Sequence, residues 1–337
     1  MAEKVLLLMN LGSPESTYLS DVKSYLDEFL MDERVIDLPY ALRWLLVKGI
    51  ITRIRPYKTA QKYKEIWTDK GSPLVFNTKD LVSKVQDLSG INTYWCMRYG
   101  LPSPELILEK IVKENPDVKE LILFPLYPHY ALSSYETAVE HVRKYYAQYA
   151  DQFQLKVVKP FYNNESYVGA LAASIEPYLK KPFDYVLFSY HGIPERHVRK
   201  TDPTKSHCLT MEDCCNQESP AHEYCYRHQV FKTTELVTKK LGLNKSQYSV
   251  SFQSRLGLDK WLTPNSVDLF EDLPKKGIKK LLVVCPAFVS DCLETLEEIE
   301  QEGKELFLNA QGKEFQLIPC LNSGEDWVKS LVKIGIS

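Results

Sequence analysis

Hydrophobic and polar positions along the first half of the chain alternate between short apolar runs and longer segments with helical spacing. Apolar runs typical of buried strands lie at 4–10, 92–98, 119–125 and 154–159. Helical patterns separate them at 19–29, 77–89, 104–114 and 134–149. A regular alternation of strand and helix predicts a parallel sheet that is covered by helices on both faces.

A second series of the same kind begins near Ser166. It predicts strands at 183–190, 247–253, 279–285 and 315–320, and helices at 166–179, 223–241, 291–309 and 324–334. The pattern therefore predicts an α/β protein with two similar halves. We expect the boundary near 160–166, with the last helix packing back on the first half.

The strand at 183–190 stops abruptly and delivers His191 at its carboxyl end, where Gly192 and Pro194 follow. Open α/β sheets bind ligands at this end of their strands. A neutral imidazole there can accept a proton or bind a metal, because its ordinary pKa of about 6.5 lies close to physiological pH. A structural histidine with satisfied hydrogen bonds is the competing interpretation.

Glu294, Glu298 and Glu302 are spaced four residues apart in the segment that follows the strand at 279–285. On one helix they form an acidic stripe whose repulsion is relieved by water or by a bound cation. An exposed face is the commoner reason for such a stripe. Glu294, however, comes in the first turn after a strand end, as His191 does, so we expect both to face one crevice.

Tyr40–Ile51 is apolar nearly all round, and the basic, aromatic stretch 53–67 follows it. We call the apolar part, about 38–56, the lip. A core segment is one interpretation of the lip, and an exposed surface for a membrane or an apolar ligand is the other. The stretch 53–67 reads either as a solvated loop or as a rim that holds a flat, anionic ligand.

Composition excludes several classes of protein. The 337 residues are 44% hydrophobic and 26% charged, and the net charge of −2 gives no electrostatic case for binding nucleic acid. No stretch approaches the 18 uncharged apolar residues of a membrane span, and Val5–Met9 is too short for a signal sequence. We expect a cytoplasmic protein with at most peripheral membrane contact.

The eight cysteines fall into two groups. Four are scattered, whereas Cys208, Cys214, Cys215 and Cys225 lie in one short polar insert. Cytosolic thiols stay reduced, so a disulfide framework is not expected. Four thiolates suit tetrahedral Zn²⁺ or an iron–sulfur cluster, and the spacing does not decide between them. Four unliganded thiols are the remaining alternative.

Several motifs together resemble the ferrochelatase family, in its bacterial type. They are LLMNLGSPE at the N-terminus, YKEIW with GSPL, MRYG at 97–100, PLYPHYALSS at 125–134, SYHGIPERH at 189–197, FQSRLG with Trp261, and SDCLETLEEI at 290–299. The resemblance implies two Rossmann-like halves with a porphyrin in the cleft between them. We expect domains at 1–163, which includes the lip, and 164–323, with the insert at 199–228, and a closing helix in 324–337.

The same resemblance implies insertion of Fe²⁺ into a porphyrin, with protoporphyrin IX expected, and release of two protons. His191 and Glu294 match the family's catalytic and metal-handling residues, and Glu298 and Glu302 continue the iron path. The residues implied in substrate binding are Arg98, Tyr99, Tyr127, Trp261 and Met31. One position departs from the family pattern, because Cys292 stands where many members have histidine.

Many ferrochelatases carry a [2Fe–2S] cluster, most of whose ligands lie in a C-terminal extension in the better-known pattern. We expect Cys208, Cys214, Cys215 and Cys225 to do this work here, with zinc as the alternative. Rival functions are a chelatase for another metal, such as cobalt, or another tetrapyrrole, and a non-catalytic iron–sulfur carrier of tetrapyrroles. The presence of both His191 and Glu294 favours the enzyme. We expect it in the cytoplasm, touching the inner face of the membrane only peripherally through the lip.

Overall fold

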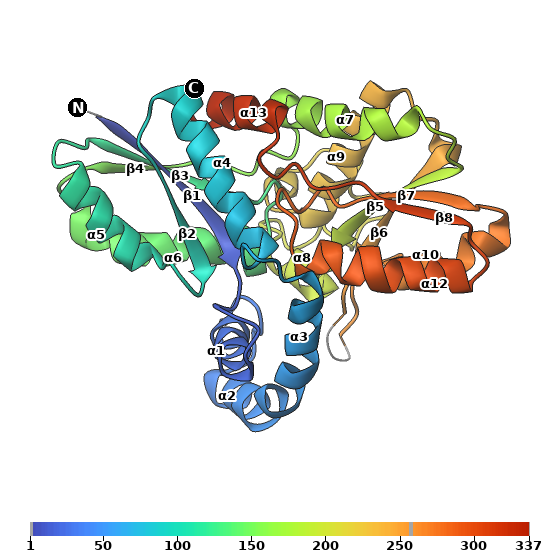
Figure 1. Ribbon diagram of the computed structural model, residues 1–337, viewed down its shortest axis with the longest axis horizontal. Coiled ribbons are helices and arrows are strands. Elements are labelled where there is room, and N and C mark those ends of the chain that lie inside the picture. The colour runs from blue at the N-terminus through green and yellow to red at the C-terminus, as the bar shows by residue number, and fades with distance from the viewer. Residues whose placement is uncertain (1–2, 256–258, 337) are drawn as a thin grey trace. The chain divides into compact units, whose positions relative to one another are not determined.

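The computed structural model describes residues 3–255 and 259–336. Leu256 and Gly257, the end of the FQSRLG motif, lie outside this range. The chain forms two compact units. The first comprises residues 1–127, 132–159 and 323–337, and the second comprises 128–131 and 160–322 (Figure 1).

The first unit is built on a four-stranded parallel sheet with the order β2-β1-β3-β4. Its strands are β1 (Lys4–Gly12), β2 (Thr93–Tyr99), β3 (Glu120–Pro125) and β4 (Gln154–Val157). Val5–Met9 of β1 is completely buried, as a central parallel strand covered on both faces requires. The continuous apolar run in the sequence follows from this position.

Helices cover both faces of this sheet. α4 (Pro73–Ser89) packs with α13 (Glu325–Ile336) on one face, and α5 (Pro104–Glu114) packs with α6 (Thr137–Tyr146) on the other (Figure 1). The closing helix α13 belongs to the first unit because Trp327 is buried there, with its ring edge-on to Phe124. A π-helix at Leu132–Glu136 leads into α6, and a 3₁₀ turn at Ala147–Tyr149 follows it.

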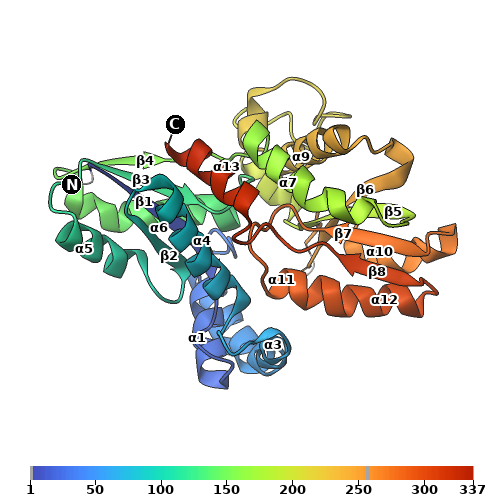
Figure 2. The same ribbon diagram turned by 45° about the horizontal axis from the view of Figure 1, so that its top comes forward.

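The second unit repeats this arrangement with the strand order β6-β5-β7-β8, again all parallel. Its strands are β5 (Tyr185–His191), β6 (Tyr248–Gln253), β7 (Lys280–Val284) and β8 (Glu314–Leu317). α7 (Glu165–Leu179) and α9 (Tyr226–Leu241) cover one face, and α10 (Ser266–Asp272) and α12 (Lys304–Asn309) cover the other (Figure 2).

Shorter elements complete the second unit. They are α8 (Glu195–Lys200), α11 (Leu293–Leu296), a π-helix at Glu298–Gly303, and 3₁₀ turns at Pro220–Glu223, Lys245–Gln247 and Pro274–Lys276. The two parallel sheets confirm the predicted α/β class, and every predicted strand is found within a few residues of its expected limits.

Two helical segments differ from the prediction. Residues 53–67 form most of a helix, α3 (Thr52–Ile66), rather than a loop. The polar and charged residues of this stretch give almost no apolar stripe, so periodicity cannot reveal it. It is held instead by burial of Tyr63 and Ile66. The predicted helix at 291–309 is broken into α11, the π-helix and α12.

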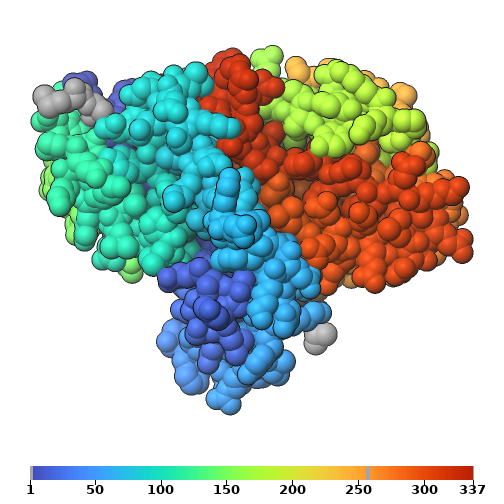
Figure 3. Space-filling model, viewed as in Figure 1, coloured from blue at the N-terminus to red at the C-terminus, as the bar shows by residue number. Residues whose placement is uncertain are grey.

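The lip emerges as part of a projecting lobe of the first unit. Helices α1 (Leu19–Leu30), α2 (Tyr40–Leu46) and α3 stand out from the sheet (Figure 1), and a π-helix at Val47–Ile51 joins α2 to α3. The same residues form a protrusion in the space-filling view (Figure 3). Large apolar side chains are exposed on it: Leu38, Tyr40, Leu42, Trp44, Leu45, Ile50, Ile54 and Tyr57. No helix in the described part of the chain is long and apolar enough to cross a membrane.

Candidate functional site

His191 is the last residue of β5, which lies inside the second sheet between β6 and β7. The ring of Phe288, in the loop after β7, stands edge-on to the imidazole with 6.1 Å between ring centroids. The Nδ1 atom of His191 is buried and has no hydrogen-bond partner among the described residues. The strand therefore presents an imidazole whose Nδ1 is not engaged by the surrounding protein.

Gly192 allows the chain to pass very close to the end of β6. Its N–H donates to the carbonyl of Gln253 at 2.7 Å. A Cβ atom at Gly192 would stand 2.9 Å from that oxygen, 3.0 Å from the carbonyl oxygen of Ser254 and 3.3 Å from the ring of Trp261. Trp261 is thus placed beside the residue that follows His191, as part of the same strand end.

Glu294 lies in the first turn of α11, and Cys292 caps that helix. The backbone carbonyl of Glu294 accepts a 2.8 Å hydrogen bond from Nε2 of Gln253, the last residue of β6. Oε1 of Gln253 in turn accepts from the hydroxyl of Ser189 on β5 at 3.0 Å. One buried amide therefore joins the strand that carries His191 to the turn that carries Glu294.

Burial is the main influence on the protonation of His191. It lowers the pKa of the imidazole below the usual value, and the negative charge of Glu294 offsets part of that effect. The ring is consequently neutral at neutral pH. Burial also raises the pKa of the Cys292 thiol well above its usual value, and the charge and hydrogen bonding of Glu294 add to this. Cys292 thus stays a neutral thiol beside Glu294.

The acidic residues after Glu294 do not lie on one regular α-helix. The π-helix at Glu298–Gly303 has a wider turn, so a spacing of four residues no longer repeats the same direction. Glu298 is half-buried and accepts a 2.5 Å hydrogen bond from the hydroxyl of Ser254, whereas Glu302 is exposed. Ser254, the residue after β6, makes this bond to Glu298 with a backbone φ of 62°. The iron path through Glu298 and Glu302 stays a prediction.

Four of the predicted substrate-binding residues belong to the first unit. Arg98 and Tyr99 end β2, Tyr127 follows β3, and Met31 follows α1. Asp32, next to Met31, connects the helix to the strand. Its carboxylate accepts hydrogen bonds from Arg98 and from the hydroxyl of Tyr99.

Asp32 is ionised although it is buried. Burial pushes its pKa up, but hydrogen bonds from Thr137 and other groups, together with the charge of Arg98, lower it below the usual value. Nε of Arg98 donates to the Thr137 hydroxyl at 2.7 Å, and the guanidinium lies 4.3 Å from the centre of the Tyr99 ring. Arg98 is thus held rigidly with its charge balanced. Its role in binding a porphyrin stays a prediction, as does the expectation of a cleft between the halves.

In the insert, all four cysteines are buried and neighbour one another. Hydrogen bonding with Cys208 is the largest cause that raises the pKa of Cys225 to about 12, and Cys225 likewise raises that of Cys215. Within residues 3–255 and 259–336, no three His, Cys, Asp or Glu side chains stand ready as a metal site. The four thiols are therefore gathered together without forming ligand geometry by themselves.

Donors surround the sulfur atoms. The backbone N–H groups of Leu209 and His228 point at the sulfurs of Cys214 and Cys225, at 3.4 and 3.5 Å. Nη1 of Arg227 lies 3.2 Å from the sulfur of Cys215. Groups of this kind stabilise negative charge on sulfur. The surroundings thus suit thiolates that bind a metal.

Polar contacts fix the backbone of the insert. The carboxylate of Asp202 accepts from the N–H groups of His207 and Cys208, at 2.9 and 2.8 Å. Burial pushes the pKa of Asp202 up, but these and further hydrogen bonds hold it well below the usual value. The carbonyl of Cys214 lies within hydrogen-bond distance of Nε2 of both His207 and His222. The loop is therefore organised even though it has little apolar core.

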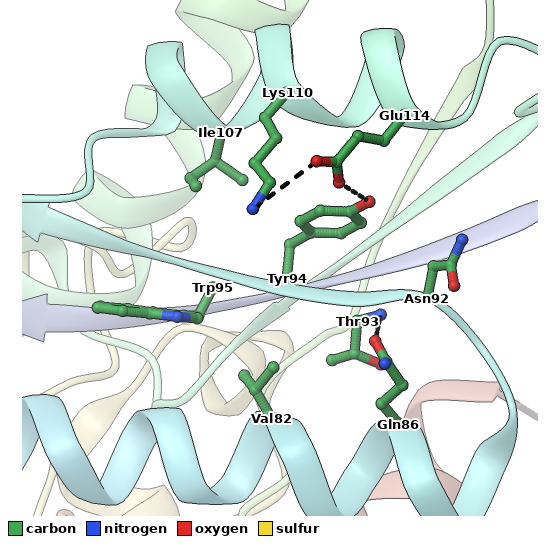
Figure 4. Close-up of a pocket in the computed structure, with 9 residues that line it drawn as sticks. All are labelled: Val82, Gln86, Asn92, Thr93, Tyr94, Trp95, Ile107, Lys110 and Glu114. Atoms are coloured by element: carbon green, nitrogen blue, oxygen red, sulfur yellow. Dashed lines mark hydrogen bonds and ion pairs between the residues drawn. The ribbon is translucent and has the colours of Figure 1, made fainter.

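A cavity of about 430 Å³ opens elsewhere, beside the edge strand β2 and between α4 and α5 (Figure 4). The polar groups that line the cavity form hydrogen bonds and an ion pair with one another. Lys110 pairs with Glu114, which accepts from the Tyr94 hydroxyl, and the side chain of Gln86 accepts from the N–H of Thr93. None of the predicted site residues lines it. The cavity belongs to the first unit, whereas His191 and Glu294 belong to the second.

Sequence reasoning missed the residues that support the site. They are Gln253, Ser254, Asp32, Asp202 and Arg227. Each acts through a contact with a residue far along the chain or inside an irregular loop, which leaves no periodic signal. Only Gln253 and Ser254 of this set could have been found from the sequence, since both belong to the FQSRLG motif.

The comparisons with known sequences all identify the same family. A family model described as Ferrochelatase matches residues 3–336. A ferrochelatase of Opitutus terrae is 48% identical, covering 98% of this chain and 96% of that relative. Ferrochelatases of Stutzerimonas stutzeri and Porphyromonas gingivalis are 44% and 42% identical, each covering 99% of this chain, with 98% and 96% of the relatives covered.

Solved structures resemble the chain in fold. SirB from Bacillus subtilis with Fe³⁺ matches with a TM-score of 0.54 and 12% identity, covering 99% of this chain and 94% of that one. The sirohydrochlorin chelatase SirB from Bacillus subtilis subspecies spizizenii, in complex with cobalt, matches with a TM-score of 0.54 and 10% identity, covering 100% and 94%. The chelatase-type fold is thereby confirmed.

Proposed function

We propose that His191 and Glu294 carry out the reaction of this chain, which belongs to the ferrochelatase family and inserts ferrous iron into a porphyrin for haem synthesis. As a lyase of this family it must remove two pyrrole protons and strip water from Fe²⁺. The observation that carries the proposal is the placement of a neutral imidazole and a carboxylate at one end of the second sheet, tied together through Gln253.

In this proposal His191 is the base. Its lowered pKa keeps the imidazole neutral, so its lone pair is available to the pyrrole protons. The charge of Glu294 stabilises the imidazolium that forms. Glu294 is the ligand that takes Fe²⁺ from water, because carboxylate oxygens bind ferrous iron and can release it to ring nitrogens. Glu298, which accepts a hydrogen bond from Ser254, is the next carboxylate on the proposed iron path.

Replacing Glu294 with glutamine tests whether this carboxylate is the ligand that binds Fe²⁺. We expect the KM for Fe²⁺ to rise about 10–100-fold, since the amide lacks the charge that binds the metal. Steady-state kinetics with varied Fe²⁺ measure the change. Glu305→Gln is the matched control, because Glu305 is exposed on α12 and lies outside the proposed iron path, and it should change this KM less than about threefold. An unchanged KM in Glu294→Gln would contradict the assignment.

We further propose that Cys208, Cys214, Cys215 and Cys225 hold a [2Fe–2S] cluster. The support is the gathering of four buried thiols with N–H donors and a guanidinium directed at sulfur. A bound cluster would supply cross-links that order a loop with little core of its own. Zinc is the alternative metal, and it suits four thiolates equally well in ligand type.

The visible absorption spectrum of protein purified without oxygen decides between these metals. We expect a coloured protein that contains iron and acid-labile sulfide, with colour that bleaches on reduction, because iron–sulfur clusters absorb visible light and zinc thiolates do not. Chemical analysis for iron, sulfide and zinc on the same sample gives the stoichiometry. A colourless, iron-free protein that contains zinc would replace the cluster by a zinc site.

We also propose that the lip rests on a membrane surface. Ile54, Tyr40 and Leu45 are 72%, 67% and 58% exposed, and Arg53 and Arg55 are exposed beside them. Apolar side chains rimmed by cations suit the interface of an anionic bilayer. The protein would then work peripherally on the inner face of the cell membrane, with porphyrin as its substrate.

Leu45→Asp tests the membrane contact. We expect binding to vesicles that contain anionic lipid to fall at least about tenfold, because burial of a leucine contributes about 1.5–3 kcal/mol and the new charge is repelled. Sedimentation with the vesicles measures the bound fraction. Leu106→Asp on α5 is the matched control, since Leu106 is 52% exposed outside the lip. Equal binding by the two variants would count against the lip.

A further inference from the structure

The start of α9 connects the cysteine insert to β5, the strand that ends at His191. Cys225 is the N-cap residue of α9, and its sulfur accepts from the N–H of His228. The next residue, Tyr226, is buried, and its hydroxyl donates a 2.8 Å hydrogen bond to the backbone carbonyl of His191. Cys225 of the insert is therefore adjacent in sequence to the residue that contacts the backbone of His191.

Other contacts hold this end of α9 in place. The side-chain N–H₂ of Gln229 donates to the carbonyls of His222 and Glu223 in the insert, at 3.1 and 2.8 Å. The Thr234 hydroxyl lies 2.8 Å from the hydroxyl of Tyr190. α9 thus touches the end of β5 at two consecutive residues, and on its other side it is bonded to the segment that carries the cysteines.

The contact with Tyr226 acts on the peptide plane that sets the direction of the imidazole. The His191 carbonyl belongs to the peptide bond with Gly192, whose N–H is held by Gln253. Hydrogen bonds to both ends of this peptide bond fix its rotation, and the rotation fixes where the Cα–Cβ bond of His191 points. Without Tyr226 the carbonyl end loses this support.

We propose that Tyr226 is a positioning residue for His191 and that it makes the orientation of the imidazole depend on the order of the cysteine insert. The inference rests on the proposed role of His191, and it holds for either metal in the insert. A metal bound by Cys225 fixes the first turn of α9 and thereby Tyr226. Loss of the metal loosens that turn and releases the His191 carbonyl.

Tyr226→Phe tests the positioning, because it removes the hydroxyl alone. We expect kcat to fall about tenfold while the KM for porphyrin stays within about twofold, since misplacement of the base affects the transition state more than binding. Amide hydrogen exchange at Gly192 should be faster, and the metal content of the insert unchanged. Tyr224→Phe is the matched control. Tyr224 lies on the other side of Cys225, and its hydroxyl makes no hydrogen bond within the described residues.

A double-mutant cycle with Cys215→Ser tests the dependence on the insert. If Tyr226 carries the effect of the metal, Cys215→Ser should lower kcat and speed exchange at Gly192 in the wild type, and should do so clearly less in Tyr226→Phe. Additive effects would overturn the link to the insert. Wild-type kcat and exchange in Tyr226→Phe would overturn the positioning role. The exchange measurement stays informative even if His191 proves not to be the base, so the two failures are distinguishable.

Discussion

Replacement of His191 with alanine is expected to lower kcat for iron insertion about 10³-fold, within the 10²–10⁴ range that a general base contributes. The KM for porphyrin should change little, because the imidazole acts on the pyrrole protons in the transition state rather than on the bound ring. Continuous detection of the metallated porphyrin by absorption gives both constants.

His191→Gln makes the expectation more specific. Glutamine keeps a polar side chain of similar reach but is not basic, so its kcat should fall as far as that of the alanine variant. Porphyrin binding, followed by absorption in the absence of iron, and the thermal unfolding midpoint should match the wild type in both variants. A glutamine variant that retains a tenth of the activity would show that basicity at this position is not required.

The strand pattern predicts correctly where the two candidate side chains, His191 and Glu294, lie relative to the strands of the second sheet. His191 and Glu294 were assigned because each follows an apolar run, and β5 and β7 are indeed parallel neighbours whose carboxyl ends meet at one edge of the second sheet. A continuous apolar run identifies a buried parallel strand, and the direction of the chain tells which end of that strand is the carboxyl end. Local sequence therefore carries enough information for the position of both groups.

The support of these groups could not be predicted in the same way. Asp32 is one acidic residue among many until folding brings it under Arg98 and Tyr99, 66 and 67 residues away. The bond from Ser254 to Glu298 spans 44 residues and needs a left-handed backbone conformation. Such contacts depend on tertiary packing, and the residues involved have no preference that distinguishes them from ordinary surface polar residues.

The break of the predicted helix at 291–309 has the same kind of cause. Most of its residues other than Gly303 are good helix formers, so local preference gives one α-helix. The structure instead bonds the N–H of Glu302 to the carbonyl of Glu297, five residues back, and Gly303 packs against the ring of Phe270 where no Cβ would fit. Packing on α10 selects the wider turn, and the acidic residues change direction with it.

The second large effect is expected from Gly192→Ala. The added Cβ would lie 2.9 and 3.0 Å from the carbonyl oxygens of Gln253 and Ser254, which are backbone atoms and cannot rotate away. His191 must then shift with its neighbour, and a displacement of about 1 Å can cost about 10²-fold in rate. We expect kcat to fall about 10²-fold and the unfolding free energy to drop by about 1–3 kcal/mol, as for an overpacked core.

Gly169→Ala is the control that separates steric crowding from the general effect of adding a methyl group. Gly169 lies inside α7, and the nearest atom to its added Cβ is Cε of Lys240 at 4.0 Å. This variant should keep full activity and gain up to about 1 kcal/mol, because alanine is favoured over glycine within a helix. Kinetic assays and thermal unfolding of both variants measure the contrast. Full activity in Gly192→Ala would mean that the imidazole reaches its position without the close approach of β5 to β6, and the geometry assigned to the base would have to be abandoned.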